Sequence, residues 1–154
     1  MLDGLENGFA ALSADLAGRV LLAQVRRGRR TGIPTAWSED NLDGAPWFVY
    51  NAIYVDGKAW STLDSSGREA PSKRGSSLKA AIGWHVLFRT IDTERTYKAV
   101  RWIADPKEGA FAGFYEEGDR PNRALTLNTN GIVLEALLYA RVGVPLAEWA
   151  RCGR

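Results

Sequence analysis

The longest apolar stretch of the chain lies between residues 123 and 139. It begins with the polar side chains Asn128 and Asn130 and is almost entirely apolar from Ile132 to Leu138, with Glu135 as the exception. A helix that is apolar on every side is normally buried, and asparagine favours a helix start because its side chain accepts from the first free amides. The pattern predicts a buried central helix whose polar N-terminus faces groups that need hydrogen bonds.

Apolar residues at helical spacing predict further helices elsewhere in the chain. Their spacing between residues 2 and 23 predicts one long helix from about Leu5 to Arg27. Similar patterns predict helices over residues 76–89 and 92–104. Near the C-terminus, Pro145 suits the first turn of a short helix that contains Trp149.

Alternating apolar and polar residues predict a strand from Phe48 to Val55, and a returning strand follows over residues 58–63. The Asp56-Gly57 pair between them is a strong signal for a tight β-hairpin turn. Residues 111–116 form a second, shorter extended piece, whereas residues 31–46 have the composition of a loop. The expected fold class is therefore mainly α, with one or two β-hairpins.

A length of 154 residues fits a single domain with a substantial core. We divide it into an N-terminal helix and loop (1–34), a middle region (35–142) and a tail helix (143–154). A hydrophobic content of 45% and a charged content of 25% are ordinary for a soluble globular protein. The net charge of +2 favours neither an acidic nor a basic partner.

Features that the sequence lacks exclude several classes of function. No apolar run has the length of a membrane span, and the acidic start of the chain does not fit a secretory signal, which favours the cytoplasm. One cysteine and one histidine do not make a zinc site. No phosphate-binding glycine loop or Ser-His-Asp arrangement is visible, and the arginines of residues 26–30 form an isolated basic cluster. We therefore expect no metal, cofactor, nucleic-acid partner or membrane insertion.

Three sequence blocks carry a resemblance to a known family. They are WSEDNLDGAPWFVYNAIYVDGKAW, SSLKAAIGWHVLFRT and GFYEEGDRPNRALTLNTNGIVLEALLY, in this order, within residues 35–139. In these blocks the chain resembles the C-terminal half of a bacterial glucoamylase-like domain family of unknown function, which is associated with exopolysaccharide and cell-envelope proteins. The resemblance implies part of an (α/α) toroid, a carbohydrate-related role and a location in the cell envelope.

The length of the chain limits what this resemblance implies about the fold. Twelve helices with their connections need roughly 190 residues before any active-site loop is added. The resemblance therefore implies a partial toroid-like helical array. Either a homo-oligomer or a missing N-terminal partner half would complete it.

Acidic residues beside aromatic ones are candidates for glycoside cleavage. This chemistry needs two carboxyl groups, ~5 Å apart for retention or ~6.5–9.5 Å apart for inversion, and an apolar neighbour raises the pKa of the acid. The candidate catalytic pair is Glu116 with Glu39 or Asp40, while Asp43 and Glu117 belong to the same two acidic sets. Acids paired in loops are more often solvated or cap helices.

Aromatic and amide side chains near these acids are the candidates for substrate binding. Aromatic rings offer apolar faces to sugar rings, and amides hydrogen-bond to sugar hydroxyls. Core packing and helix capping are the competing explanations for the same side chains. The candidate substrate-binding residues are Trp37, Asn41, Trp47, Tyr115, Asn128 and Asn130.

These residues and the resemblance support competing functions. The first is a glycoside hydrolase-like protein that acts on a bacterial glucan or exopolysaccharide by paired-carboxylate acid/base chemistry. The alternative is a non-catalytic saccharide-binding or assembly module left from a truncated toroid. It would expose aromatic residues in a shallow groove and an unsealed apolar helix face. A third is a remnant with no saccharide role that is stable only as an oligomer.

Overall fold

The protein has a mixed α and β fold. The structure, a computed structural model, describes residues 1–152, with 51% of the residues in helices and 21% in strands of three sheets. The expected mainly-α array resembling part of an (α/α) toroid is therefore wrong. The sequence pattern missed most of the short strands because partners distant in the sequence hold them in place, and local periodicity does not register such partners.

The helices of the described residues lie before and after the first sheet in the chain. The α-helices are α1 (Leu2–Asn7), α2 (Ala11–Thr31), α3 (Leu78–Phe88), α4 (Ile91–Val100), α5 (Leu127–Val142) and α6 (Leu146–Cys152), with short 3-10 helices η1 (Pro71–Lys73) and η2 (Arg101–Ile103).

All strand pairs are antiparallel. The first sheet has the order β1-β2-β3, the second has the order β4-β7-β8, and β5 and β6 form a pair. The strands are β1 (Glu39–Asn41), β2 (Phe48–Val55), β3 (Lys58–Asp64), β4 (Gly75–Ser77), β5 (Ala104–Asp105), β6 (Gly109–Ala110), β7 (Gly113–Tyr115) and β8 (Arg120–Asn122).

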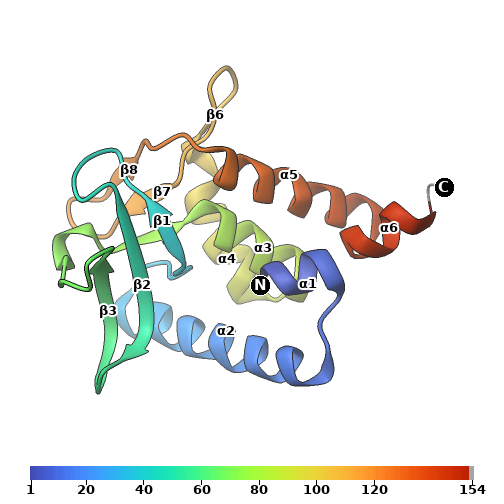
Figure 1. Ribbon diagram of the computed structural model, residues 1–154, viewed down its shortest axis with the longest axis horizontal. Coiled ribbons are helices and arrows are strands. Elements are labelled where there is room, and N and C mark those ends of the chain that lie inside the picture. Colours follow the sequence, from blue (N-terminus) through green and yellow to red (C-terminus); the bar gives the residue numbers. More distant parts are fainter. Residues whose placement is uncertain (153–154) are drawn as a thin grey trace.

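Helix α3 lies at the centre of the molecule, and α1, α4 and α5 pack around it (Figure 1). Most of its side chains are buried, including Lys79, Ile82 and Trp84. Met1 lies against Gly83, where a Cβ would collide with the methionine sulfur. The central helix of the fold is therefore α3 and not α5, which the sequence pattern had favoured.

Helix α5 is buried on one side only, contrary to expectation. Thr129, Ile132 and Ala136 are buried, whereas Leu127 is 93% exposed and Leu134 is 67% exposed. The long apolar run therefore supplies both an inner face and an outer face. An apolar helix face without a covering element is a feature of interaction surfaces.

The single long helix predicted from Leu5 to Arg27 is divided in two. Gly8 and Phe9 have positive φ angles of 82° and 50°, so the chain leaves the helical conformation there and α2 begins after the turn. The Phe9 ring packs against Gly4, at a place where any larger side chain would collide with it. The turn places α1 against α3 (Figure 1).

The fully buried side chains of α2 are small or polar, while Val20 and Leu21 are partly buried against the core. Ala17, Gln24 and Arg27 are buried, whereas Leu12 and Leu16 are 80% and 55% exposed. Gln24 and Arg27 are buried because they have hydrogen-bond partners from distant parts of the chain. This orientation of α2 places Arg27 in the interior.

The predicted hairpin is confirmed as β2 and β3, with Val55 opposite Lys58. Asp56 and Gly57 have φ angles of 47° and 77°, as the favoured two-residue turn requires. The second extended piece also forms a short hairpin, β7 with β8. Part of the expected loop is instead β1, in which Asp40 pairs with Val49.

The second sheet brings the segment before α3 against β7. Gly113 permits this close pairing, because a Cβ at this position would lie 2.0 Å from the Ser76 carbonyl oxygen. One residue beyond the last pair, the Glu116 amide donates to the Arg74 carbonyl oxygen over 2.9 Å. The sheet thus fixes residues 74 and 116 side by side and positions the site described below.

Candidate functional site

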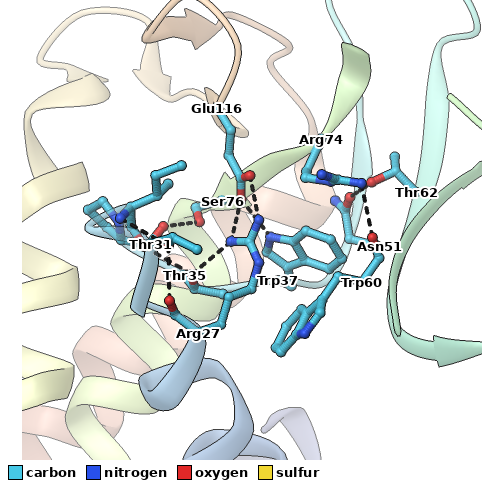
Figure 2. Close-up of polar contacts among 12 residues, drawn as sticks. Arg27, Thr31, Thr35, Trp37, Asn51, Trp60, Thr62, Arg74, Ser76 and Glu116 are labelled. Carbon is cyan, nitrogen blue, oxygen red and sulfur yellow. Dashed lines mark hydrogen bonds and ion pairs between the residues drawn. The ribbon is translucent and has the colours of Figure 1, made fainter. Parts of the chain in front are cut away.

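A buried ion pair joins α2 to the end of β7 (Figure 2). The Arg27 guanidinium donates to both oxygens of Glu116, over 2.8 Å and 2.6 Å. The side chains are only 5% and 8% exposed. Thr35 adds an acceptor for Arg27 at 3.0 Å. This is the bidentate geometry in which arginine binds carboxylates most strongly.

Aromatic rings enclose this ion pair. Trp37 donates from Nε1 to Glu116 over 3.0 Å, and the Arg27 guanidinium lies 4.7 Å from the Trp37 ring centre. Trp60 meets Trp37 edge-on, with 5.2 Å between ring centres and 84° between planes. A second guanidinium, that of Arg74, lies 5.6 Å from the Trp37 ring centre. The indole of Trp37 is therefore the common neighbour of both cations.

The contacts of Glu116 limit its chemistry. One oxygen accepts from Arg27 and Trp37, and the other accepts from Arg27. A general acid must hold a proton and reach the leaving oxygen of its substrate. Burial keeps Glu116 from solvent. The arrangement fits a structural ion pair better than a catalytic acid.

A second polar cluster surrounds Lys79, at the start of α3. Its ammonium donates to Asn128 over 2.7 Å and to Glu39 over 3.3 Å, and it lies 3.9 Å from Asp40. Lys79 and Asp40 are almost fully buried, whereas the Glu39 side chain is 51% exposed. Three of the predicted site residues, Glu39, Asp40 and Asn128, are thus brought together by one lysine.

The two carboxyl groups beside Lys79 differ in burial. Burial raises the pKa of Asp40 to about 8, against the opposing effects of the Lys79 ammonium and the Ser77 hydroxyl. Ser77 donates to Asp40 over 3.0 Å. Glu39 is the acid that faces solvent, with its side chain 51% exposed. Asp40 holds the proton that acid catalysis needs, but the protein covers it.

The remaining predicted residues lie apart from these clusters or serve the fold. Tyr115 donates to Asp43 over 2.7 Å, and burial together with that bond raises the pKa of Tyr115. The Asn41 carbonyl accepts from Asn122. The Asn130 side chain bonds to both backbone groups of Ala110 and to the Thr126 carbonyl, and Trp47 is exposed.

The predicted catalytic acids therefore contact two different cations. Glu116 pairs with Arg27, whereas Glu39 and Asp40 contact Lys79. Neither cation was predicted as a site residue. Arg27 belongs to a run of arginines that looks like a solvated helix end, and Lys79 was not distinguished within an apolar helix. A lone lysine in an otherwise apolar helix was the one signal that pointed to a buried partner.

The outer face of β2 carries exposed aromatic rings. Tyr50 and Tyr54 are 51% and 70% exposed, and Phe48 meets Tyr50 edge-on with 5.0 Å between ring centres. The inner face of the same strand holds Val49, which is fully buried. Because side chains alternate between the two faces of a strand, Phe48, Tyr50 and Tyr54 form one row, the aromatic strip.

Metal and membrane features can be stated for residues 1–152. No group of three or more His, Cys, Asp or Glu side chains in this range gathers closely enough to hold a metal ion. No single helix in the same range is long and apolar enough to cross a membrane, and α5 and α6 reach that hydropathy only together, with a 62° bend between them.

The fold and the polar clusters define a mixed α/β domain with two buried cations at its helix–sheet junctions. The chain belongs to the family DUF3131, described as a protein of unknown function, which it matches over residues 1–143. This match gives no support to the glucoamylase-like family that the sequence blocks resemble. No curated protein and no solved structure matches the chain.

We expect Glu116→Gln to lower the free energy of unfolding by about 3–5 kcal/mol, because it leaves the buried Arg27 without a countercharge. Urea denaturation followed by circular dichroism measures this loss. The control is Asp15→Asn, which removes an exposed pair with Arg19 and should cost about 0–1 kcal/mol. Equal effects of the two substitutions would contradict a structural role for the buried pair.

We also expect Asp40 to lower stability as pH rises. It remains protonated in the folded protein until about pH 8, whereas in the unfolded chain it ionises near 3.8. The free energy of unfolding therefore declines across that window. Asp40→Asn removes this decline, so the stability of the variant relative to the wild type should increase from pH 5 to pH 8.

Denaturation curves at several pH values measure this trend, and Glu39→Gln is the control at the exposed neighbour. A relative stability of Asp40→Asn that stays flat or falls with rising pH would show that Asp40 is ionised in the fold.

Proposed function

We propose that this domain binds an extended saccharide on the aromatic strip of β2 and does not cleave it. The observation that carries the proposal is the exposure of Tyr50 and Tyr54 on one face of a paired strand. Tyrosine combines an apolar ring face with a hydroxyl that hydrogen-bonds at its edge. Both properties suit a sugar ring, which has apolar C–H faces and a polar rim.

The spacing of the strip favours a chain of sugars over a single ring. Tyr54 is the fourth residue after Tyr50, and a strand rises about 3.3 Å per residue, so the two positions lie about 13 Å apart. One sugar ring cannot contact both tyrosines at that distance. Trp47, the residue before β2, is 66% exposed and is a further aromatic side chain next to the strip in the sequence.

The rigidity of the support also favours binding. Strand β2 is the middle strand of its sheet, with β1 on one side and β3 on the other. The backbone at Phe48 and Tyr50 is therefore paired on both edges, and the backbone at Tyr54 is paired with β3. Binding groups on such an element lose little conformational freedom when a ligand arrives.

The environments of the acids support binding over cleavage. A glycosidase needs two carboxyl groups that flank one bond in a shared cleft. Here Glu116 is held by Arg27 and Trp37, and Asp40 is 4% exposed. The exposed acid, Glu39, contacts Lys79. These three acids therefore do not form a solvent-exposed pair of carboxyl groups that could act as general acid and general base.

A second candidate function is assembly with another copy of this chain through the outer face of α5 and α6. Leu127, Leu134 and Leu137 follow one another at helical spacing and are 93%, 67% and 49% exposed. Trp149 of α6, 46% exposed, adds to the apolar residues in this part of the chain. A two-fold axis places the same stripe on both partners, so an apolar stripe can cover itself.

We expect the double variant Tyr50→Ala/Tyr54→Ala to bind oligosaccharides at least about tenfold more weakly, because two ring contacts are worth more than about 1.4 kcal/mol together. Isothermal titration with fragments of bacterial glucans and exopolysaccharides measures this loss.

The matched control is Trp102→Ala, which removes another exposed ring, 59% exposed and far from β2 in the chain. Its affinity should equal that of the wild type. Release of reducing ends from the same fragments by the wild-type protein would contradict binding without cleavage, and unchanged affinity of the double variant would contradict the aromatic strip.

We expect Leu134→Glu to abolish self-association, because it places a charge on the apolar stripe that a second copy would cover. Sedimentation equilibrium over a series of protein concentrations measures the dimer fraction. The control is Lys98→Glu on α4, an exposed position outside the stripe. A wild type that stays monomeric at every concentration would contradict assembly.

A further inference from the structure

A groove runs along the free edge of β3, between that strand and the segment of residues 69–74. Its volume is about 430 Å³, within the ~300–1,000 Å³ of typical ligand sites. Strand β3 is the edge strand of its sheet, so this side of its backbone is open over part of its length. The groove is lined by Lys58, Ala59, Trp60, Ser61, Thr62, Glu69, Pro71 and Arg74.

Arg74 is held firmly at the wall of this groove. Its carbonyl accepts from the Glu116 amide over 2.9 Å, and the next residue, Gly75, pairs with Tyr115 in the second sheet. Its guanidinium packs over Trp37 and donates from Nη2 to the Trp60 carbonyl over 3.0 Å. Figure 2 shows this guanidinium beside the indole of Trp37, with its hydrogen bond to the Trp60 carbonyl.

The two guanidinium groups beside Trp37 differ in one respect. Arg27 has Glu116 as its countercharge, whereas no ion pair joins Arg74 to a carboxylate within the described residues 1–152. The Nε of Arg74 is buried and has no acceptor in that range. A guanidinium has five N–H donors, and a buried donor without a partner is costly. Arg74 therefore has unused capacity for an anion.

The other charges of the groove leave it positive. Lys58 and Glu69 form an ion pair, and their side chains are 67% and 54% exposed. These two charges balance each other, so the charge of Arg74 remains. Exposed ion pairs are worth little, which means that a ligand can draw Lys58 away from Glu69 at small cost.

The groove continues from the aromatic strip. Ala59 lies directly opposite Tyr54 in the β2–β3 pair, and Ala59 also lines the groove. Directly opposed residues of antiparallel strands are near neighbours on the same face. Since alanine is small and exposed here, no bulky side chain of β3 separates Tyr54 from the groove.

We propose that this groove binds the carboxylate of an acidic sugar, so that the saccharide ligand is a uronate-containing chain. The inference rests on the proposed saccharide-binding function and names its substrate class. The Arg74 guanidinium pairs with the sugar carboxylate, the geometry for which arginine is best suited. Neighbouring sugars pass over Ala59 and lie on Tyr54 and Tyr50.

The test compares an oligoglucuronide with a neutral gluco-oligosaccharide of the same length and linkage, by isothermal titration at low salt. The wild type should bind the acidic chain about tenfold or more tightly, because charged hydrogen bonds are the strong ones. Arg74→Gln should abolish that preference, measured as the ratio of the two affinities. The control Arg30→Gln removes an exposed arginine of α2 and should keep the preference.

Lys58→Gln is a second variant at an exposed position of the same groove, and it keeps the test decisive if Arg74→Gln does not fold. It should reduce the preference by a smaller factor of about two to five. The double variant Tyr50→Ala/Tyr54→Ala should lose affinity for both saccharides.

The outcomes separate the two proposals. Equal binding of the acidic and neutral chains would overturn the inference and leave saccharide binding intact. Binding of neither chain would overturn the proposed function and the inference with it. Arg74-dependent binding of an oligoglutamate peptide in place of the acidic saccharide would overturn both in favour of a peptide on the β3 edge.

Discussion

The buried pair of Arg27 and Glu116 is the constraint on which the arrangement of the sheets and helices depends. It joins residues 89 positions apart in the chain, and it draws α2, the start of the first sheet and the end of β7 to one point. Removing two charges from water is costly and is offset only when every partner is in place. The positions of Thr35 and Trp37 are therefore tied to the same pair, since each adds a bond to it.

Lys79 repeats this principle on the central helix. Its ammonium holds Glu39 of β1 and Asn128 of α5, so a single cation connects a sheet to two helices. Because polar side chains occupy part of the interior, some apolar side chains lie on the surface. Leucines that would ordinarily fill the interior, such as Leu12 of α2 and Leu134 of α5, lie on the surface. Burial of polar side chains in place of these leucines thus leaves apolar helix faces exposed to a partner.

The elements that the sequence predicted are those that local interactions determine. The β2–β3 hairpin was predicted because Asp56-Gly57 is a turn signal that needs no distant partner. Strand β1 and the division between α1 and α2 were not predicted, because they depend on pairing with β2 and on contacts around Phe9. The site was predicted in part. Asp40 and Asn128 both lie next to Lys79. The apolar periodicity predicts that Lys79 is part of a helix, but it does not predict which residues Lys79 contacts.

The surface proposed to bind saccharide lies against this polar interior, and the two are physically linked. Trp37 contacts Arg27 on the buried side and Arg74 at the wall of the groove, while the carbonyl of Trp60 accepts from Arg74. Of the two arginines beside Trp37, Arg27 is neutralised by Glu116. The charge of Arg74 is not neutralised by a carboxylate of the described residues. The sheet pairing of Gly75 and the hydrogen bonds of Arg74 to Glu116 and Trp60 fix the position of Arg74. Arg74 therefore needs little reorganisation to bind an anion, and such preorganisation gives a small polar site its selectivity.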